Sequence, residues 1–84
     1  MKRLKIYVAG AYSDTNVLRV LKNIGRGQYW AAELFMEGFA PFSPWADRDF
    51  IFMNFQEDFK VEDFYEYSME WLKVSDAVFV VPDP

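Results

Sequence analysis

Residues 76–81 of this chain read Asp-Ala-Val-Phe-Val-Val, and Pro82-Asp83-Pro84 follows them. A short apolar run rich in β-branched residues predicts a buried strand of a parallel sheet. In open α/β sheets, ligand and catalytic groups gather just beyond the carboxyl ends of the strands. We therefore expect residues 1–84 to belong to a single α/β domain whose last part follows Pro84. The alternative is a small binding fold that never completes a catalytic site.

Two earlier segments have the composition of further strands of the same sheet. Residues 4–9, Leu-Lys-Ile-Tyr-Val-Ala, end at Gly10, as a first strand does when it enters a tight turn. Residues 39–44, Phe-Ala-Pro-Phe-Ser-Pro, predict a short second strand. Its prolines suit a strand end and not the centre of a hydrogen-bonded ladder.

The segment between these two strands has a helical pattern with two possible beginnings. One alternative is a single helix from Asn16 to Glu37, and the other is a short turn followed by a helix that begins near Asn23. Asparagine can cap either helix. Gly25 and Gly27 favour the later beginning slightly, because glycine is least costly in a first turn.

A second helix is predicted before the last strand, from residue 61 to about residue 74. Asp63 helps to cap its beginning, and Asp76 is expected to accept backbone N–H groups in the turn that follows. The order strand, helix, strand, insert, helix, strand predicts a parallel sheet with right-handed crossovers, and hence an α/β fold. The inward face of this helix is expected to carry Tyr65, Ser68, Met69, Trp71 and Leu72.

Composition excludes several classes of protein and of chemistry. The 84 residues carry a net charge of −4 and contain neither cysteine nor histidine, so disulfides and thiolate chemistry are absent. No apolar run approaches the roughly 18–20 residues that span a bilayer. The carboxylates are scattered without a metal-ligand spacing, so we expect no metal and no cofactor. These features predict a cytoplasmic protein without a membrane partner.

The charge is distributed unevenly along the sequence. Residues 1–26 carry six basic side chains against the single acidic Asp14, whereas residues 27–84 carry three basic and twelve acidic side chains. The basic residues are spread over a strand and a helix and are not clustered in a groove, so we do not expect nucleic-acid binding.

Three stretches in order carry a family resemblance. They are Tyr7-Val8-Ala9-Gly10-Ala11-Tyr12-Ser13, residues 38–44 (Gly-Phe-Ala-Pro-Phe-Ser-Pro) and residues 71–78 (Trp-Leu-Lys-Val-Ser-Asp-Ala-Val). Together they resemble the nucleoside 2-deoxyribosyltransferase-like superfamily, and in particular its small members of the DUF4406 type. The resemblance implies a flavodoxin-like or Rossmann-like three-layer α/β sandwich with a parallel sheet, of which this chain contributes three strands.

The resemblance also implies a chemistry. In that family a Glu in a Ser-x-Gly-x-x-x-Glu segment after the third strand attacks the anomeric carbon of a deoxyribonucleoside, and the base is released or exchanged. That segment is expected beyond Pro84, so no catalytic residue is assigned within the chain. An acidic residue commonly stands eight positions before the Asp that opens the third strand, where this sequence has Ser68 before Asp76. The alternative is a binding or sensing module on the same fold without turnover.

The loop after the first strand, residues 10–16, is the first candidate site. Backbone N–H groups between a strand end and a helix can hold an anion. Gly10, Tyr12, Ser13 and Asn16 would then surround the sugar or a 5′-phosphate of a nucleoside or nucleotide. The competing interpretation is an ordinary turn with Tyr12 as its anchor.

The residues after the second strand form the other candidate site. Trp45 could stack on a base and Asp47 could bond to the edge of that base, or Trp45 could plug the end of the sheet while Asp47 begins a helical turn. Ser68, by analogy with the family position, could bond a ribose or base, or its hydroxyl could bond back to a helix carbonyl. The aromatic stretch 50–59 is expected to be core or a subunit interface, so we expect a homo-oligomer.

Overall fold

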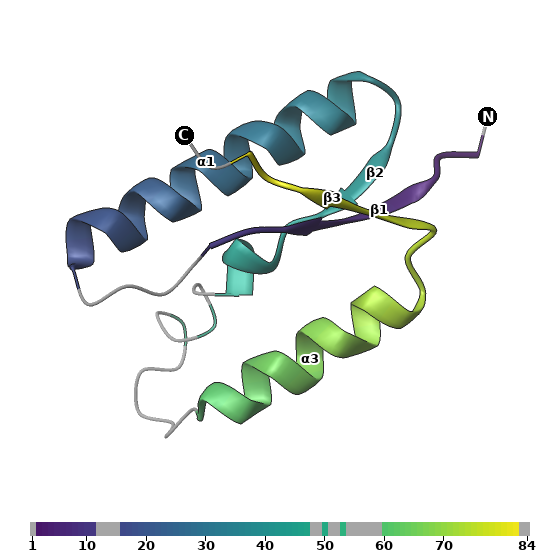
Figure 1. Cartoon of the computed structure of the whole chain (residues 1–84). Helices are drawn as coiled ribbons and strands as arrows, with labels where there is room; N and C mark the ends of the chain where they lie inside the picture. The colour runs from purple at the N-terminus through teal and green to yellow at the C-terminus, as the bar shows by residue number, and fades with distance from the viewer. Residues whose placement is uncertain (1, 12–15, 48–49, 51–52, 54–59, 83–84) are drawn as a thin grey trace.

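The computed structural model describes residues 2–11, 16–47, 50, 53 and 60–82. Its elements follow the order β1 (Lys5–Ala9), α1 (Val17–Met36), β2 (Ala40–Phe42), the 3₁₀ helix η1 (Pro44–Asp47), α3 (Val61–Lys73) and β3 (Ala77–Val80) (Figure 1). The predicted alternation of strands and helices is confirmed. The prediction that residues 76–81 form a buried strand is wrong, because Val78 and Val80 of β3 are 51% and 71% exposed. In the described part of the chain, no helix has the apolar length that a bilayer crossing requires.

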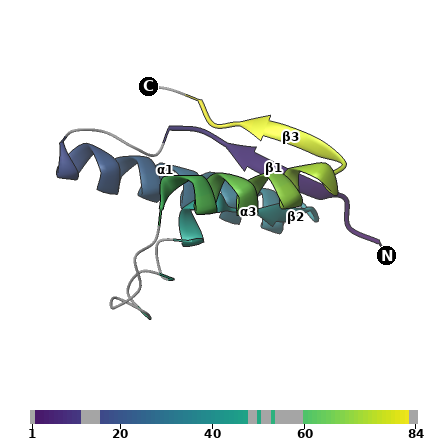
Figure 2. The same ribbon diagram turned by 90° about the horizontal axis from the view of Figure 1, so that it is seen from below.

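The sheet has three parallel strands in the order β2-β1-β3, so β1 is central. Figure 1 shows α1 above the sheet and α3 below it, and Figure 2 shows α3 in front of the strands when the molecule is seen from below. The α/β fold with a parallel sheet is therefore confirmed, and the three layers of a sandwich are partly formed. The order β2-β1-β3 is that of the first three strands of a flavodoxin-like sheet.

The segment between β1 and β2 is one helix, so the preferred prediction of a later beginning near Asn23 is wrong. Asn16 is the N-cap of α1, and its side-chain oxygen accepts the backbone N–H groups of Leu18 and Arg19 at 2.8 and 3.4 Å. Each helical glycine costs roughly 0.5–1 kcal/mol relative to alanine. The packing of the buried face of α1, which includes Gly27 itself, outweighs that local cost.

The end of α1 is tied to the N-terminal segment. Gly38 has a φ of +100°, a conformation that favours glycine, and it follows the last turn of the helix. The Arg3 guanidinium donates to the carbonyl oxygens of Phe35 and Phe39 at 3.2 and 2.9 Å and lies 4.5 Å from the centroid of the Phe35 ring. Arg3 therefore places a cation beside the carbonyl end of α1, where it interacts favourably with the helix dipole.

The buried core lies between the central strand and α1. Side chains along β1 alternate, and Ile6 and Val8 are its buried members. The core cluster consists of Val8, Ile24, Ala31 and Trp45, with Val20, Leu34, Phe79 and Val81 packed against it.

The two edge strands are fixed to β1 by different contacts. Pro41 lies in the middle of β2, opposite Ile6. The Ala40 N–H donates to the Leu4 carbonyl at 2.8 Å, so alternation turns the nitrogen of Pro41 to the open edge, where no donor is needed. At the start of β3, the Asp76 carboxylate accepts a backbone N–H at 2.7 Å, but the donor is Lys5 at the start of β1 and not a residue of the turn where it was predicted.

The inward face of α3 differs from the prediction. Tyr65 and Met69 are 67% and 50% exposed, so their assignment to the inward face is wrong. Phe64, Ser68 and Leu72 are half-buried. Trp71, also predicted to face inward, stacks on Phe42 of β2. Apolar side chains occur around most of this helix, so their spacing does not fix its rotation. The capping role of Asp63 is confirmed, because its carboxylate accepts the Lys60 N–H at 3.1 Å.

Candidate functional site

The carboxyl ends of β1 and β3 meet at one point of the sheet edge. The Val81 N–H donates to the Ala9 carbonyl at 2.7 Å, directly beyond the last pair of the β1–β3 ladder. A Cβ on Gly10 would stand 3.0 Å from the Cβ of Val81 and 3.2 Å from the indole of Trp45. Glycine at position 10 therefore lets the chain leave β1 between β3 and Trp45.

This meeting point is also where the topology reverses. From β1 the chain crosses through α1 to β2 on one side, and then returns through α3 to β3 on the other side. The two connections leave opposite faces of the sheet (Figure 1). Ligands of open α/β folds bind outside the strand ends at such a switch point. The position of Gly10 and Ala11 thus follows from the fold and not from a local motif alone.

Trp45 forms the floor beneath this loop. Its side chain is 1% exposed, and its indole N–H donates to the Ala11 carbonyl at 3.0 Å. The ring fills the space above Gly27, where a Cβ would approach it to 2.5 Å. Of the two roles left open by the sequence, the buried position corresponds to the plug at the sheet end, and no face of the ring is open to a base. Its hydrogen bond fixes the first residue after Gly10.

Asn16 stands at the other end of the loop, where α1 begins. Its side-chain oxygen accepts the N–H groups of Leu18 and Arg19, which are two of the donors that a helix N-terminus would offer to an anion. An anion that used these two donors would have to displace the Asn16 side chain. The arrangement therefore suits an uncharged hydroxyl or a base edge in the loop more readily than a phosphate held by the helix.

The remaining predicted site residues are placed as follows. Asp47 ends η1, and its side chain lies outside the described part of the chain, as do Tyr12 and Ser13. Ser68 lies in the middle of α3 and is half-buried. The structure thus brings Gly10 and Trp45 into one contact and places Asn16 where the loop enters α1.

Two contacts near the strand ends were not anticipated from the sequence. The Ser43 hydroxyl, which follows β2, donates to the side-chain oxygen of Gln28 on α1 at 2.6 Å. The Ala11 carbonyl is the partner of Trp45. Both join residues more than ten positions apart, and no local sequence signal could have indicated them.

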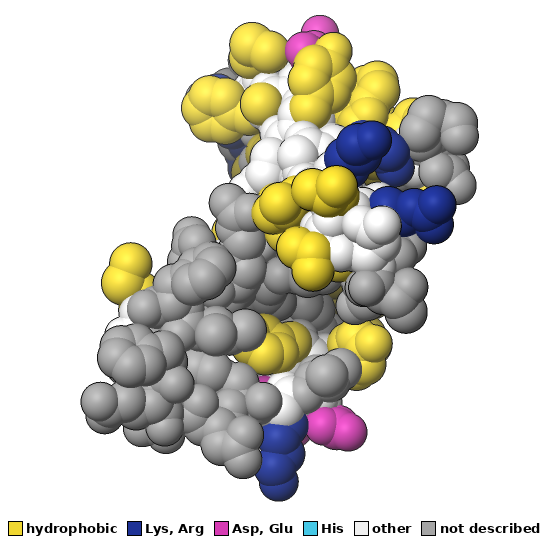
Figure 3. Space-filling model, turned by 90° about the vertical axis from the view of Figure 1, so that its left-hand side faces the viewer, with side chains coloured by type: hydrophobic (Ala, Val, Ile, Leu, Met, Phe, Trp, Pro, Cys, Tyr) yellow, Lys and Arg dark blue, Asp and Glu magenta, His cyan; other side chains and the backbone are white. Residues whose placement is uncertain are grey.

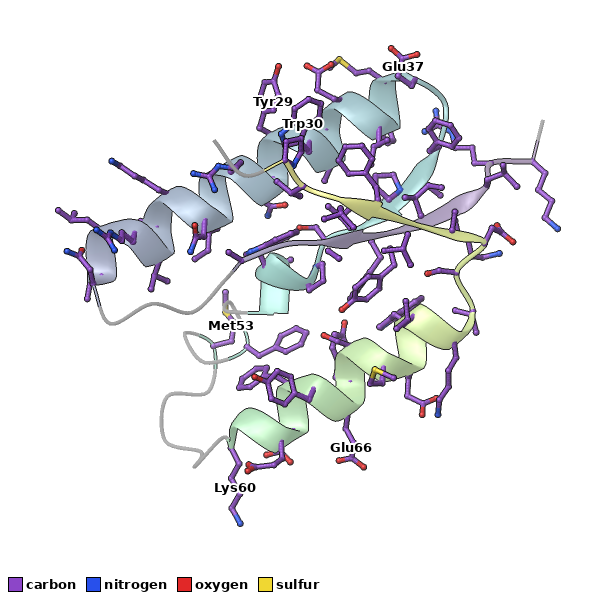
Figure 4. The ribbon with its side chains drawn as sticks, in the orientation of Figure 1. Tyr29, Trp30, Glu37, Met53, Lys60 and Glu66 are labelled. Carbon is purple, nitrogen blue, oxygen red and sulfur yellow. The ribbon has the colours of Figure 1, made fainter. Side chains whose placement is uncertain are left out.

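An aromatic cluster lies on the opposite face of the sheet, towards α3. Phe42 of β2 stacks on Trp71 with 5.3 Å between ring centroids. The ring centroids of Tyr7 and Tyr67 lie 5.7 and 6.0 Å from the centroid of the Phe42 ring. Phe50, from the predicted aromatic stretch, meets Tyr67 edge-on at 5.4 Å. Phe50 thus adds to the cover of this face; Met53, labelled in Figure 4, is 78% exposed, and the rest of the stretch lies outside the described residues.

What the described residues of the site offer is hydrogen-bonding groups and shape. Among residues 2–11, 16–47, 50, 53 and 60–82, no three acidic side chains come together as a metal site would require. In comparisons with known proteins, no family model matches the chain, and neither a curated protein nor a solved structure matches it. The functional argument therefore rests on the strand ends and on the residues that surround them.

Proposed function

We propose that the chain binds a nucleoside or nucleotide at the carboxyl ends of β1 and β3, as a cytoplasmic protein of the nucleoside 2-deoxyribosyltransferase-like type. The observation that carries the proposal is the junction of Gly10 with Val81 and Trp45 at the switch point of the sheet. Two of the three stretches that carry the family resemblance include residues of this junction or border it. The loop 10–16 would receive the sugar, and Tyr12 and Ser13 would contact it.

The chemistry proposed for the complete protein is cleavage or transfer at the N-glycosidic bond. A carboxylate attacks the anomeric carbon, the base leaves with a proton, and a second base or water releases the sugar. The resemblance assigns that carboxylate to a Glu beyond residue 84. The 84 residues are accordingly proposed to carry the binding half of the site.

Ser68 favours a second function, binding without turnover. It stands where the family commonly has an acidic residue, and it is half-buried in the middle of α3. A serine hydroxyl can bond a sugar, but it is far too weak an acid to protonate a leaving base near neutral pH. A sensing module of this kind would hold the nucleoside and leave its glycosidic bond intact.

The first test is ligand-dependent stability of the purified chain with a panel of nucleosides and 5′-nucleotides. A ligand at one hundred times its dissociation constant should raise the free energy of unfolding by about 2.7 kcal/mol. Nucleosides are expected to match or exceed their 5′-phosphates, because Asn16 already occupies two of the donors of the helix end. If no compound of the panel raises the melting temperature, the chain does not bind nucleosides.

Variants locate the site and separate binding from turnover. Replacing Tyr12 and Ser13 by alanine together should abolish the shift, whereas Tyr65→Ala, which changes a tyrosine that is 67% exposed on α3, should leave it unchanged. Free base measured by chromatography after incubation distinguishes the two functions. Release of base would contradict the sensing module, and binding without release would contradict turnover by this chain.

A further inference from the structure

The outward side of α1 carries a continuous apolar stripe that nothing in the described structure covers. We call it the outer stripe: Leu18, Leu21, Gly25, Tyr29, Ala32, Phe35 and Met36. Its five large side chains are all more than half exposed. Figure 4 shows Tyr29 pointing away from the sheet, and Figure 3 shows hydrophobic side chains beside Lys and Arg side chains where α1 faces the viewer.

The spacing of the stripe is that of a helix that packs against another helix. Five residues of the stripe, together with Gln28, are separated alternately by three and four residues, which is the heptad spacing of a coiled-coil seam. In order they are Leu18, Leu21, Gly25, Gln28, Ala32 and Phe35. A Cβ on Gly25 would have no neighbour within 4 Å, so the glycine leaves open space at the middle of the seam. A partner helix can approach closely there.

Charged residues follow the stripe along one flank. Each of them comes one position after a stripe residue, so all lie on the same side of it. The first half of this flank is basic and the second half is acidic: Arg19, Lys22 and Arg26, then Glu33 and Glu37.

We infer that α1 pairs with α1 of a second copy of this chain, antiparallel, about a two-fold axis between Gly25 and Gln28. In an antiparallel pair the same flank of both helices meets, and the direction of one helix is reversed. The basic half of each helix then lies against the acidic half of the other. The two helix dipoles point in opposite directions, so the partly positive end of each helix lies near the partly negative end of its partner. A parallel pair would put like charges at the same level.

The register follows from the seam itself. With the axis between Gly25 and Gln28, Leu21 of one copy lies beside Ala32 of the second copy, and Leu18 lies beside Phe35. Leu21 thus lies opposite a small residue, Gly25 leaves room for Gln28, and the large side chains of Leu18 and Phe35 meet at each end of the seam. Lys22 and Glu33, which each follow one of these residues, come within two residues of the same level, about 3 Å along the helix axis. This approach occurs twice, once on each side of the two-fold axis. The interface is self-complementary, as a closed two-fold dimer requires.

The experiment uses charge reversal at this pair and measures mass by sedimentation equilibrium up to about 1 mM, the weak end of specific association. Lys22→Glu and Glu33→Lys, each alone, convert both symmetry-related pairs to repulsion and should raise the dimer dissociation constant about tenfold or more. An equimolar mixture of the two variants restores both attractions and should form heterodimers. The double variant on one chain should recover the wild-type constant.

A matched control has the same change in net charge elsewhere. Lys73→Glu reverses an exposed lysine on α3, which pairs with Glu70 on its own helix, and should leave the dimer constant unchanged. Circular dichroism checks that each variant is folded. A wild-type chain that stays monomeric throughout the range, single variants that dimerise like the wild type, or a mixture that associates no better than its components would each overturn the antiparallel pair.

Discussion

The face of the sheet that packs against α1 and the face that packs against α3 differ in how completely they exclude water. Every member of the core cluster lies on the α1 side or in the loop that closes it, and Val8 and Trp45 are 0% and 1% exposed. No described residue of α3 is buried, and Trp71, its main contact with the sheet, is 44% exposed. One face is thus held by close packing and the other by partly exposed aromatic rings.

The shape of the candidate site depends on the same packed face that stabilises the chain. Trp45 belongs to the packed face, and its indole N–H holds the first residue of the loop after Gly10. The loop conformation therefore depends on the core beneath it. The aromatic cluster near α3 packs instead on Phe42 of β2, so we expect that face to vary with less effect on the site.

The largest expected effect comes from removing a ring on each face. Trp45→Ala should lower the free energy of unfolding by about 3–5 kcal/mol, because a fully buried ring is lost and a cavity remains. Trp71→Ala should cost about 1–2 kcal/mol, because its ring is only partly buried and water can reach the space that it leaves. Urea denaturation followed by circular dichroism measures both.

Equal losses in the free energy of unfolding for the two tryptophan variants would contradict the difference between the two faces. The nucleoside-dependent shift gives an independent check on the same variants. Trp45→Ala should also abolish any ligand-induced stabilisation, since the loop after Gly10 loses its hydrogen-bond anchor, whereas Trp71→Ala should retain it.

The two helical glycines give a smaller effect, with opposite signs. Gly27→Ala places a Cβ 2.5 Å from the Trp45 ring and should destabilise the chain by about 1–3 kcal/mol through overpacking. Gly25→Ala meets no atom within 4 Å and should stabilise it by about 0.5–1 kcal/mol, because alanine restricts the unfolded chain. The shift in the urea midpoint decides the sign for each, and equal shifts would mean that Trp45 does not pack on Gly27.

Much of the fold could be predicted from the sequence because the signals were local. The three strands have their own composition and boundaries. The sequence left the single long α1 as one of two alternatives and could not select it, because the reason for Gly27 lies in the ring of Trp45, eighteen positions away. Helix propensity counts the cost of a glycine and has no access to the residue that needs the space.

The candidate site was predictable in position but not in its contacts. The parallel order of strands places the ends of β1 and β3 together, so Gly10 and the end of β3 could be expected at one edge. The sequence left two roles for Trp45, and only its burial distinguishes them. The rotation of α3 was missed for a related reason: Phe64 and Tyr65 are adjacent aromatic residues, and only the packing decides which one faces inward.

The smallest expected effect concerns the beginnings of the two helices. Asn16→Ala removes the side-chain cap of α1 and should cost about 1 kcal/mol, because the N–H groups of the first turn lose their acceptor in a helix that must stay formed to keep the core packed. Asp63→Ala removes the carboxylate that accepts the Lys60 N–H and should cost only about 0.5 kcal/mol, the low end for a helix cap. The first turn of α3 can open to water without exposing a buried residue, so part of the lost bond is replaced by solvent.

Amide hydrogen exchange separates the two cases: Asp63→Ala should speed exchange only in the first turns of α3, whereas Asn16→Ala should speed it throughout α1 and in β1. Faster exchange confined to the first turn of α1 would show that the packed face tolerates fraying as well as the aromatic one does.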